Sequence, residues 1–181
     1  ALAYIRSVFD GHGETTGTHY SLRRADVAPT GSDGLQIVVG GGGPKKTPAL
    51  AGTYADEYNM FVTDAATLEA RTAVMRAAAR DAGRDPAAIL VSMAGPALVF
   101  ADEDRYRTEL SARATRREMA PGDYAAMLTE RFVPHGTPSM ARAAVDRMAD
   151  AGVGRYYVQE YAALDDVDLE AMAVVFDALT S

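Results

Sequence analysis

The chain has 181 residues, 48% of them apolar, and a formal net charge of −7 at pH 7. This length and apolar content allow a substantial core, which excludes an intrinsically disordered protein. The acidic balance argues against a nucleic-acid-binding protein, because such a protein needs a basic face. The absence of cysteine excludes disulfides, a thiol nucleophile and thiolate metal sites.

Targeting signals are not visible along the chain. No apolar run reaches the length of a membrane span and no signal peptide is present, so we expect a cytoplasmic protein that binds no membrane. No histidine has a second ligand at a metal-binding spacing, so we expect no metal site. Residues 1–9 are typical of the last turns of an amphipathic helix without an N-cap, and the chain starts without methionine. We therefore expect a preceding part of the protein to be missing from this chain.

Apolar runs, capping residues and glycine stops predict the elements. Residues 10–35 form a long polar stretch, in which a short hairpin strand is possible near His19. In chain order, the remaining pattern predicts a strand at 37–39, a helix after Thr47, a strand at 58–62, a helix to residue 82, a strand at 89–94, helices at 103–119, 124–132 and 139–151, a strand at 155–161 and a helix at 169–179.

Strands that alternate with helices of this length indicate parallel strands joined by helical crossovers. Four such units are visible. They make either half of a (β/α)₈ barrel or an open doubly wound sheet. In both cases a functional site is expected at the carboxyl ends of the strands.

A glycine-rich loop follows the first of these strands. Gly40 to Gly43 precede Pro44, Lys45, Lys46 and Thr47, which open the next helix. Glycines allow close approach of a ligand, and the helix N-terminus, the two lysines and the threonine hydroxyl add donors and positive charge. This combination favours a phosphate site. The spacing matches neither a Walker loop nor the dinucleotide fingerprint, and a glycine turn that only packs helix against strand is the alternative.

The carboxyl ends of the other strands carry Tyr58-Asn59, Ser92-Met93 and Gln159-Glu160. His135 precedes a helix that starts at Thr137 and Pro138. It is either a ligand contact or a residue that supports the turn. The charged helix at 103–119 is interpreted as a solvated face.

Several of these segments resemble the second half of the luciferase-like monooxygenase family, in particular its deazaflavin-dependent oxidoreductases. The most specific are Gly40–Thr47 and the following Tyr54-Ala55-Asp56 and Asn59. Weaker matches follow in the family's order: Gly17-Thr18-His19-Tyr20, Gly83-Arg84-Asp85-Pro86, His135-Gly136-Thr137-Pro138 and Ala151-Gly152-Val153.

The resemblance implies a TIM-like barrel in which residues 1–181 form a single domain that supplies strands five to eight, with an insertion at about residues 10–35. It implies coenzyme F420, or alternatively FMN, as the cofactor. The cofactor phosphate would be held by Gly41, Gly42, Gly43, Lys46 and Thr47. The residues that would face the ring or the substrate are Tyr58, Asn59, Gln159 and Glu160.

The implied activity is an oxidoreductase that transfers hydride between a reduced deazaflavin or flavin and a small organic substrate. A flavin version could be a monooxygenase. The first four strands of the family are not in this sequence, so the catalytic residues stay unassigned. The half barrel is expected to pair with the missing N-terminal half, another chain or a second copy of itself, because open sheet edges are rarely left exposed. The alternative function is a non-catalytic flavin-binding or dimerising half barrel.

Overall fold

The computed structural model describes residues 1–9, 15–18, 21–22, 35–160 and 169–180. Most of the predicted insertion at 10–35 therefore lies outside the described residues. The contacts divide the chain into two compact units, which are residues 1–58 with 73–89 and residues 59–72 with 90–181. Whether residues 1–181 act as one domain stays a prediction.

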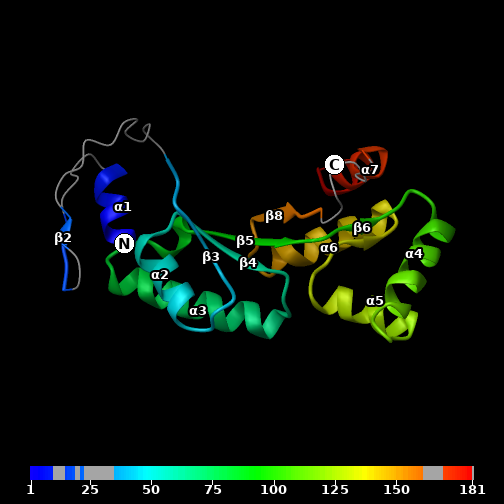
Figure 1. Ribbon diagram of the computed structural model, residues 1–181, viewed down its shortest axis with the longest axis horizontal. Helices are drawn as coiled ribbons and strands as arrows, with labels where there is room; N and C mark the ends of the chain where they lie inside the picture. The colour runs from blue at the N-terminus through cyan, green and yellow to red at the C-terminus, as the bar shows by residue number, and fades with distance from the viewer. Residues whose placement is uncertain (10–14, 19–20, 23–34, 161–168, 181) are drawn as a thin grey trace. The chain divides into compact units, whose positions relative to one another are not determined.

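Helices and strands alternate along the described chain (Figure 1). The helices are α1 (Leu2–Phe9), α2 (Lys46–Tyr54), α3 (Ala65–Asp81), the short 3₁₀ helix η1 (Pro86–Ala88), α4 (Glu103–Thr115), α5 (Pro121–Glu130), α6 (Pro138–Asp150) and α7 (Leu169–Thr180). The strands are β1 (Thr15–Thr16), β2 (Ser21–Leu22), β3 (Val38–Gly40), β4 (Glu57–Phe61), β5 (Leu90–Gly95), β6 (Leu98–Val99), β7 (His135–Gly136) and β8 (Arg155–Val158).

The larger sheet has the strand order β3-β4-β5-β8, with β4 shared by the two units. Strands β5 and β8 are parallel, and their register pairs Ser92 with Arg155 and Gly95 with Val158. A separate parallel pair joins β6 to β7 through Leu98 and His135. This second pair was not predicted, because strands of two residues show no period in the sequence.

Side-chain caps are found at the starts of α3 and α4, whereas α2, α5 and α6 begin without a side-chain capping hydrogen bond. The Asp64 carboxylate accepts a hydrogen bond from the Thr67 amide at 2.8 Å, and the Asp102 carboxylate accepts one from the Arg105 amide at 2.7 Å. Gly83 adopts a φ of +70° after α3, as expected for a left-handed stop. Helices α3 and α4 therefore begin where the sequence predicts.

Two boundary predictions were wrong around Pro121. Helix α4 ends at Thr115 instead of residue 119, and Glu118 adopts a φ of +55°. Pro121 lies in the first turn of α5, which starts three residues earlier than predicted. Proline suits the first turn of a helix, because an N–H group there has no intrahelical acceptor and its absence therefore costs no hydrogen bond.

The unit of residues 59–72 and 90–181 has two apolar clusters. One packs α4 against α5 and is formed by Leu98, Tyr106, Leu110, Ala114, Tyr124, Leu128 and Val133. The other contains Val99 of β6, Ala141 of α6, and Val175 and Ala178 of α7. In Figure 1, α4 and α5 lie side by side, and α7 lies beside α6. Strands β6 and β7 thus connect both clusters.

In the other unit, α2 and α3 approach each other at Gly52. A Cβ atom at Gly52 would collide with the backbone carbonyl of Met75 and lie 2.9 Å from the amide nitrogen of Ala79. Both obstacles are backbone atoms, which cannot rotate away. The close contact between these helices therefore requires glycine at position 52.

Large apolar side chains on the strands remain exposed in both units. Val38 of β3 is 50% exposed in the first unit, while Phe61 of β4 is 60% exposed in the second. Tyr157 of β8 is 39% exposed, also in the second. Exposed apolar side chains mark an interaction surface where they form a contiguous patch.

We expect Gly52→Ala to lower the free energy of unfolding by about 1–3 kcal/mol, because the new methyl group meets fixed backbone atoms. The matched control is Gly122→Ala in α5, where a Cβ has no atom within 4 Å. That change should leave the free energy unchanged or raise it by up to about 1 kcal/mol, since alanine is the better helix former. Urea unfolding of both variants gives the comparison, and equal effects would contradict the close packing at Gly52.

Candidate functional site

The glycine loop between β3 and α2 is folded around Thr47. Gly41 adopts a φ of +149°, a backbone conformation that favours glycine. A Cβ atom at Gly41 would lie 3.2 Å from Cγ2 of Thr47, and one at Gly43 would lie 3.1 Å from its Oγ1. Gly42 has nothing within 4 Å of the corresponding position. The Thr47 hydroxyl thus lies against the loop, while Gly42 leaves the backbone open to a ligand.

Positive charge is concentrated beside this loop. Lys45 and Lys46 are the only lysines of the chain, and both are exposed. Helix α2 begins at Lys46, and its N-cap residue makes no capping hydrogen bond through its side chain. The first N–H groups of a helix lack intrahelical acceptors. The helix amides and the Thr47 hydroxyl therefore lie beside two consecutive exposed lysines, a combination of groups that suits a phosphate.

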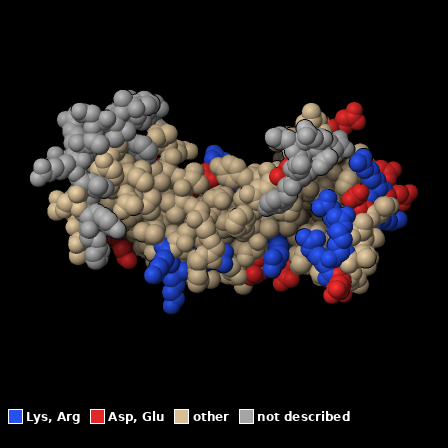
Figure 2. All heavy atoms as spheres, viewed as in Figure 1, with Lys and Arg blue, Asp and Glu red and all other residues tan. Residues whose placement is uncertain are grey.

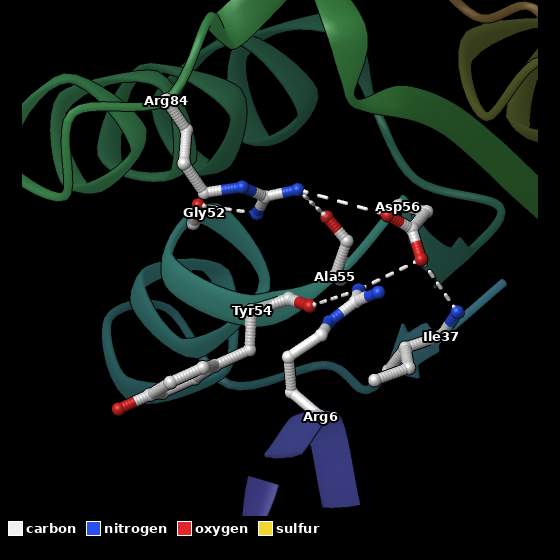
Figure 3. A network of polar contacts seen from close by, with 7 residues as sticks. All are labelled: Arg6, Ile37, Gly52, Tyr54, Ala55, Asp56 and Arg84. Carbon is white, nitrogen blue, oxygen red and sulfur yellow. Dashed lines mark hydrogen bonds and ion pairs between the residues drawn. The ribbon is translucent and has the colours of Figure 1, made fainter. Parts of the chain in front are cut away.

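The other end of α2 is held by three charged side chains from distant parts of the chain. Figure 3 shows the guanidinium groups of Arg6 and Arg84 converging on Asp56, just after the helix. Arg6 donates to the Asp56 carboxylate at 2.8 Å and to the Tyr54 carbonyl at 2.7 Å. The Ile37 amide donates to the same carboxylate at 2.8 Å.

Arg84 completes this group of contacts. Its guanidinium donates to the carbonyls of Gly52 at 2.9 Å and Ala55 at 2.6 Å, and it lies 3.8 Å from the second oxygen of Asp56. Cations stabilise the C-terminal end of a helix, where carbonyls lack partners. The segments Tyr54-Ala55-Asp56 and Gly83-Arg84-Asp85-Pro86, which carried part of the resemblance, therefore meet and anchor α2.

The protonation of Asp56 follows from these contacts. Partial burial by itself raises the pKa of Asp56, but the hydrogen bonds from Ile37 and Arg6 and the charges of both arginines outweigh it. The pKa of Asp56 therefore lies below its ordinary value of 3.8. The carboxylate is ionised at neutral pH and offsets one of the two guanidinium charges.

Tyr58 and Asn59, which the sequence predicted at the carboxyl end of their strand, are instead the second and third residues of β4 (Glu57–Phe61), and they differ in their exposure. Tyr58 is completely buried. Asn59 is half-buried, and its side-chain amide donates to the Ser92 hydroxyl of β5 at 2.9 Å. Neighbouring residues of a strand point to opposite faces of the sheet. Because side chains alternate along β4, Asn59 lies on the same face as Ser92, and Tyr58 lies on the opposite face.

Gln159 and Glu160 follow β8 and line a pocket of about 320 Å³ in the second unit. The backbone N–H of Gln159 donates to the Gly95 carbonyl at 2.8 Å, which joins the end of β8 to the end of β5. Across the pocket stand Arg105, Glu109 and Arg113, one helical turn apart on α4. The interpretation of this helix as a solvated face only was therefore incomplete. The i, i+4, i+8 spacing of these charges was the available signal.

His135 is buried between α4 and α5. Thr129 donates its hydroxyl proton to the Ala125 carbonyl at 3.0 Å, so it accepts from His135 Nε2 at 2.8 Å. His135 Nδ1 then accepts from the Tyr106 hydroxyl at 2.7 Å. Burial, with a smaller effect of the Arg147 charge, lowers the pKa of His135 below its ordinary value of 6.5. Both ring nitrogens are thus engaged, and the geometry favours the supporting role over a ligand contact.

The described residues show neither a metal centre nor a membrane helix. Within them, no three His, Asp or Glu side chains lie close enough to hold a metal ion. No helix in the described part of the chain is both long and apolar enough to cross a bilayer.

The fold and the site elements define a parallel α/β protein with a glycine loop at the carboxyl end of a strand. A model of the luciferase-like monooxygenase family matches residues 1–158, and the chain belongs to this family. A comparison with curated protein sequences finds no match.

Solved structures share the fold at low sequence identity. An F420-dependent secondary alcohol dehydrogenase, in complex with an F420–acetone adduct, has a TM-score of 0.69 and 18% identity. The coenzyme F420-dependent tetrahydromethanopterin reductase of Methanopyrus kandleri has a TM-score of 0.65 and 18% identity. The oxygenating constituent of 3,6-diketocamphane monooxygenase from Pseudomonas putida, in complex with FMN, has a TM-score of 0.61 and 19% identity.

The match covers nearly the whole of this chain but only part of these enzymes. It spans 99% of the chain and 60% of the alcohol dehydrogenase, and 98% of the chain and 58% of each of the other two. The predicted family and the predicted partial barrel of parallel strands are thereby confirmed. The roles of the predicted site residues stay predictions.

We expect Asp56→Asn to lower the free energy of unfolding at pH 7 by about 1–3 kcal/mol, because it removes a charged acceptor from two guanidinium groups. The folded-state pKa is lowered, so the contribution of Asp56 is present above its unfolded pKa and is lost as pH falls through the folded value. The variant and the wild type should therefore converge in acid.

Urea unfolding between pH 7 and pH 2.5 measures this difference. Asp81→Asn, at an exposed position near the end of α3, is the control and should change the free energy by less than about 0.5 kcal/mol. A variant at Asp56 that behaves like the one at Asp81 would show that the contacts do not anchor α2.

Proposed function

We propose that this chain is part of a luciferase-like oxidoreductase that transfers hydride between a reduced deazaflavin, or alternatively a flavin, and a small organic substrate. The observation that carries the proposal is the glycine loop of a luciferase-like chain, with its open backbone at Gly42 and both lysines of the protein beside it. Solved structures of this fold include one complex with an F420–acetone adduct and one with FMN.

The loop would hold the phosphate that both cofactors carry. In this proposal, amides at Gly42 and Gly43 and the Thr47 hydroxyl donate to phosphate oxygens, and the Lys46 ammonium neutralises their charge. Gly41 contributes its backbone conformation. The bound cofactor supplies the hydride chemistry, while the chain binds, orients and excludes water.

The end of β8 would serve the substrate. Gln159 offers an amide and Glu160 a carboxylate on the wall of one pocket, and both can orient polar groups of a small molecule. Asn59 would approach the ring or the substrate through its half-buried amide. Tyr58 has no exposed surface, so in this proposal it supports the strand that presents Asn59.

The proposal includes a partner for the exposed strand side chains. The chain spans 58–60% of its structural neighbours. We infer that an N-terminal half, or a second chain, covers the apolar side chains at Val38, Phe61 and Tyr157. A half barrel without such a partner would leave apolar surface and sheet edges in water.

Sedimentation analysis tests the partner. We expect the chain alone to have a mass above 19.2 kDa through self-association, or to bind an N-terminal half of a luciferase-like barrel supplied separately. Phe61→Lys, at the most exposed of the three strand positions, should weaken the association, because it places a charge in an apolar contact. A cooperative, monodisperse monomer of 19.2 kDa that binds no such half would contradict the inference.

Chemical modification tests the phosphate loop. Because the only lysines are Lys45 and Lys46, an acylating reagent reports on this loop, with the amine of Ala1 as an internal control. We expect FMN or F420 to slow acylation of the two lysines without affecting Ala1, as followed by mass spectrometry. Riboflavin, which has the ring but no phosphate, should protect much less.

Titration of each cofactor in the same experiment compares how tightly F420 and FMN bind. The one that protects at the lower concentration is the preferred cofactor, and Lys46→Ala should weaken its binding about tenfold, as expected for the loss of one charge-assisted contact. Equal protection by riboflavin and FMN, or none by either cofactor, would refute the role of the loop. Binding without turnover of any substrate by the completed barrel would favour a non-catalytic flavin-binding protein.

A further inference from the structure

The pocket lined by Gln159 and Glu160 has apolar walls and a rim of mixed charge, because its charged lining residues are two arginines and two glutamates. The walls are formed by side chains of β6, β8 and α7, namely Leu98, Val99, Val158, Met172 and Val175. The rim is formed by α4, with Arg105, Glu109 and Arg113. Its volume of about 320 Å³ is at the small end of ligand pockets, which span roughly 300–1,000 Å³.

Arg113 is the group of the rim that has capacity to bind. Among the residues that the structure describes, its Nε atom is buried without a hydrogen-bond partner. Within the described residues it forms an ion pair with Glu109, whose carboxylate oxygen lies 3.9 Å from Nε, too far for a hydrogen bond. A half-exposed pair at this distance stabilises little. The Arg113 side chain is 43% exposed although its Nε atom is buried, so its terminal N–H groups can pair with an incoming acceptor.

Arg105 has a different role in the same rim. Its guanidinium lies over the Phe100 ring, 5.3 Å from the ring centroid. A cation held on an aromatic face adds positive potential to the rim while its stem covers the apolar wall. Figure 2 shows the wider setting, in which basic and acidic side chains alternate over the part of the chain that Figure 1 labels α4 and α5.

We propose that this pocket binds a small molecule with an apolar chain and a carboxylate, which pairs with the guanidinium of Arg113. A carboxylate can pair with two parallel N–H groups of a guanidinium, and the other guanidinium of the lining, that of Arg105, already lies over the Phe100 ring. The apolar chain would displace water from the walls at Leu98, Val158 and Val175. The identification of this molecule as the substrate rests on the proposed function. The binding of the molecule to the pocket does not depend on it.

Octanoate is the probe for this site, with octanol and octylamine as matched ligands that change only the head group. Calorimetric titration of the full chain at low salt should show octanoate binding more tightly than octanol, and octylamine least. Arg113→Gln should weaken octanoate binding at least tenfold and leave octanol binding unchanged, because only the charged contact is lost. The control is Arg116→Gln, one helical turn away and outside the pocket lining, which should bind octanoate as the wild type does.

A second variant tests the apolar part. Ala171→Phe, on the α7 wall, should remove binding of both octanoate and octanol by filling the pocket, with thermal unfolding as the check that the protein stays folded. Octanoate that binds folded Arg113→Gln as tightly as the wild type, or that fails to bind the folded wild type, would overturn the proposal. Protection of the lysines by the cofactor involves residues outside this pocket. If the cofactor gave no protection while octanoate still bound, only the proposed cofactor role would be refuted.

Discussion

The anchoring of helix α2 at its C-terminal end is the contact on which the candidate cofactor site depends. Two guanidinium groups, from Arg6 and Arg84, donate to carbonyls at the end of this helix, and Asp56 holds both. A helix of nine residues is only about 13 Å long. Fixing its last turn therefore also fixes the direction of its first turn, where the glycine loop ends.

The loop itself shows how a local charge can oppose the charge of the whole molecule. The chain carries a net charge of −7, yet both of its lysines stand beside four consecutive glycines. Screening in physiological salt limits the reach of distant surface charges to roughly 8 Å. An anion bound at the loop therefore experiences the lysines and the helix end more than the acidic surface elsewhere. The position of the Thr47 side chain against Gly41 and Gly43 keeps the loop compact without closing it at Gly42.

In the second unit, a buried hydrogen-bonded chain has a comparable positioning role. Tyr106, His135 and Thr129 join α4, β7 and α5 through one neutral imidazole. Tyr106 lies next to Arg105 and one turn before Leu110, so the contact that buries His135 also sets the rotation of α4. That rotation decides whether the arginines of α4 face the pocket or the solvent. Burial disfavours the charged imidazolium, so the ring stays neutral and its Nδ1 atom can accept from Tyr106.

Much of this protein can be read from the residues alone, because the signals involved are local. Alternating apolar runs and caps at Asp64 and Asp102 define the elements, and the glycines beside Lys45 and Lys46 define the loop. Tertiary structure alone decided what meets over long separations in the chain. The pairing of Arg6 with Asp56, the contact of Gly52 with α3, and the arginines of α4 opposite Glu160 join residues about 25 to 50 positions apart. Such pairings depend on how the helices pack, and a single sequence carries no period or spacing that reports them.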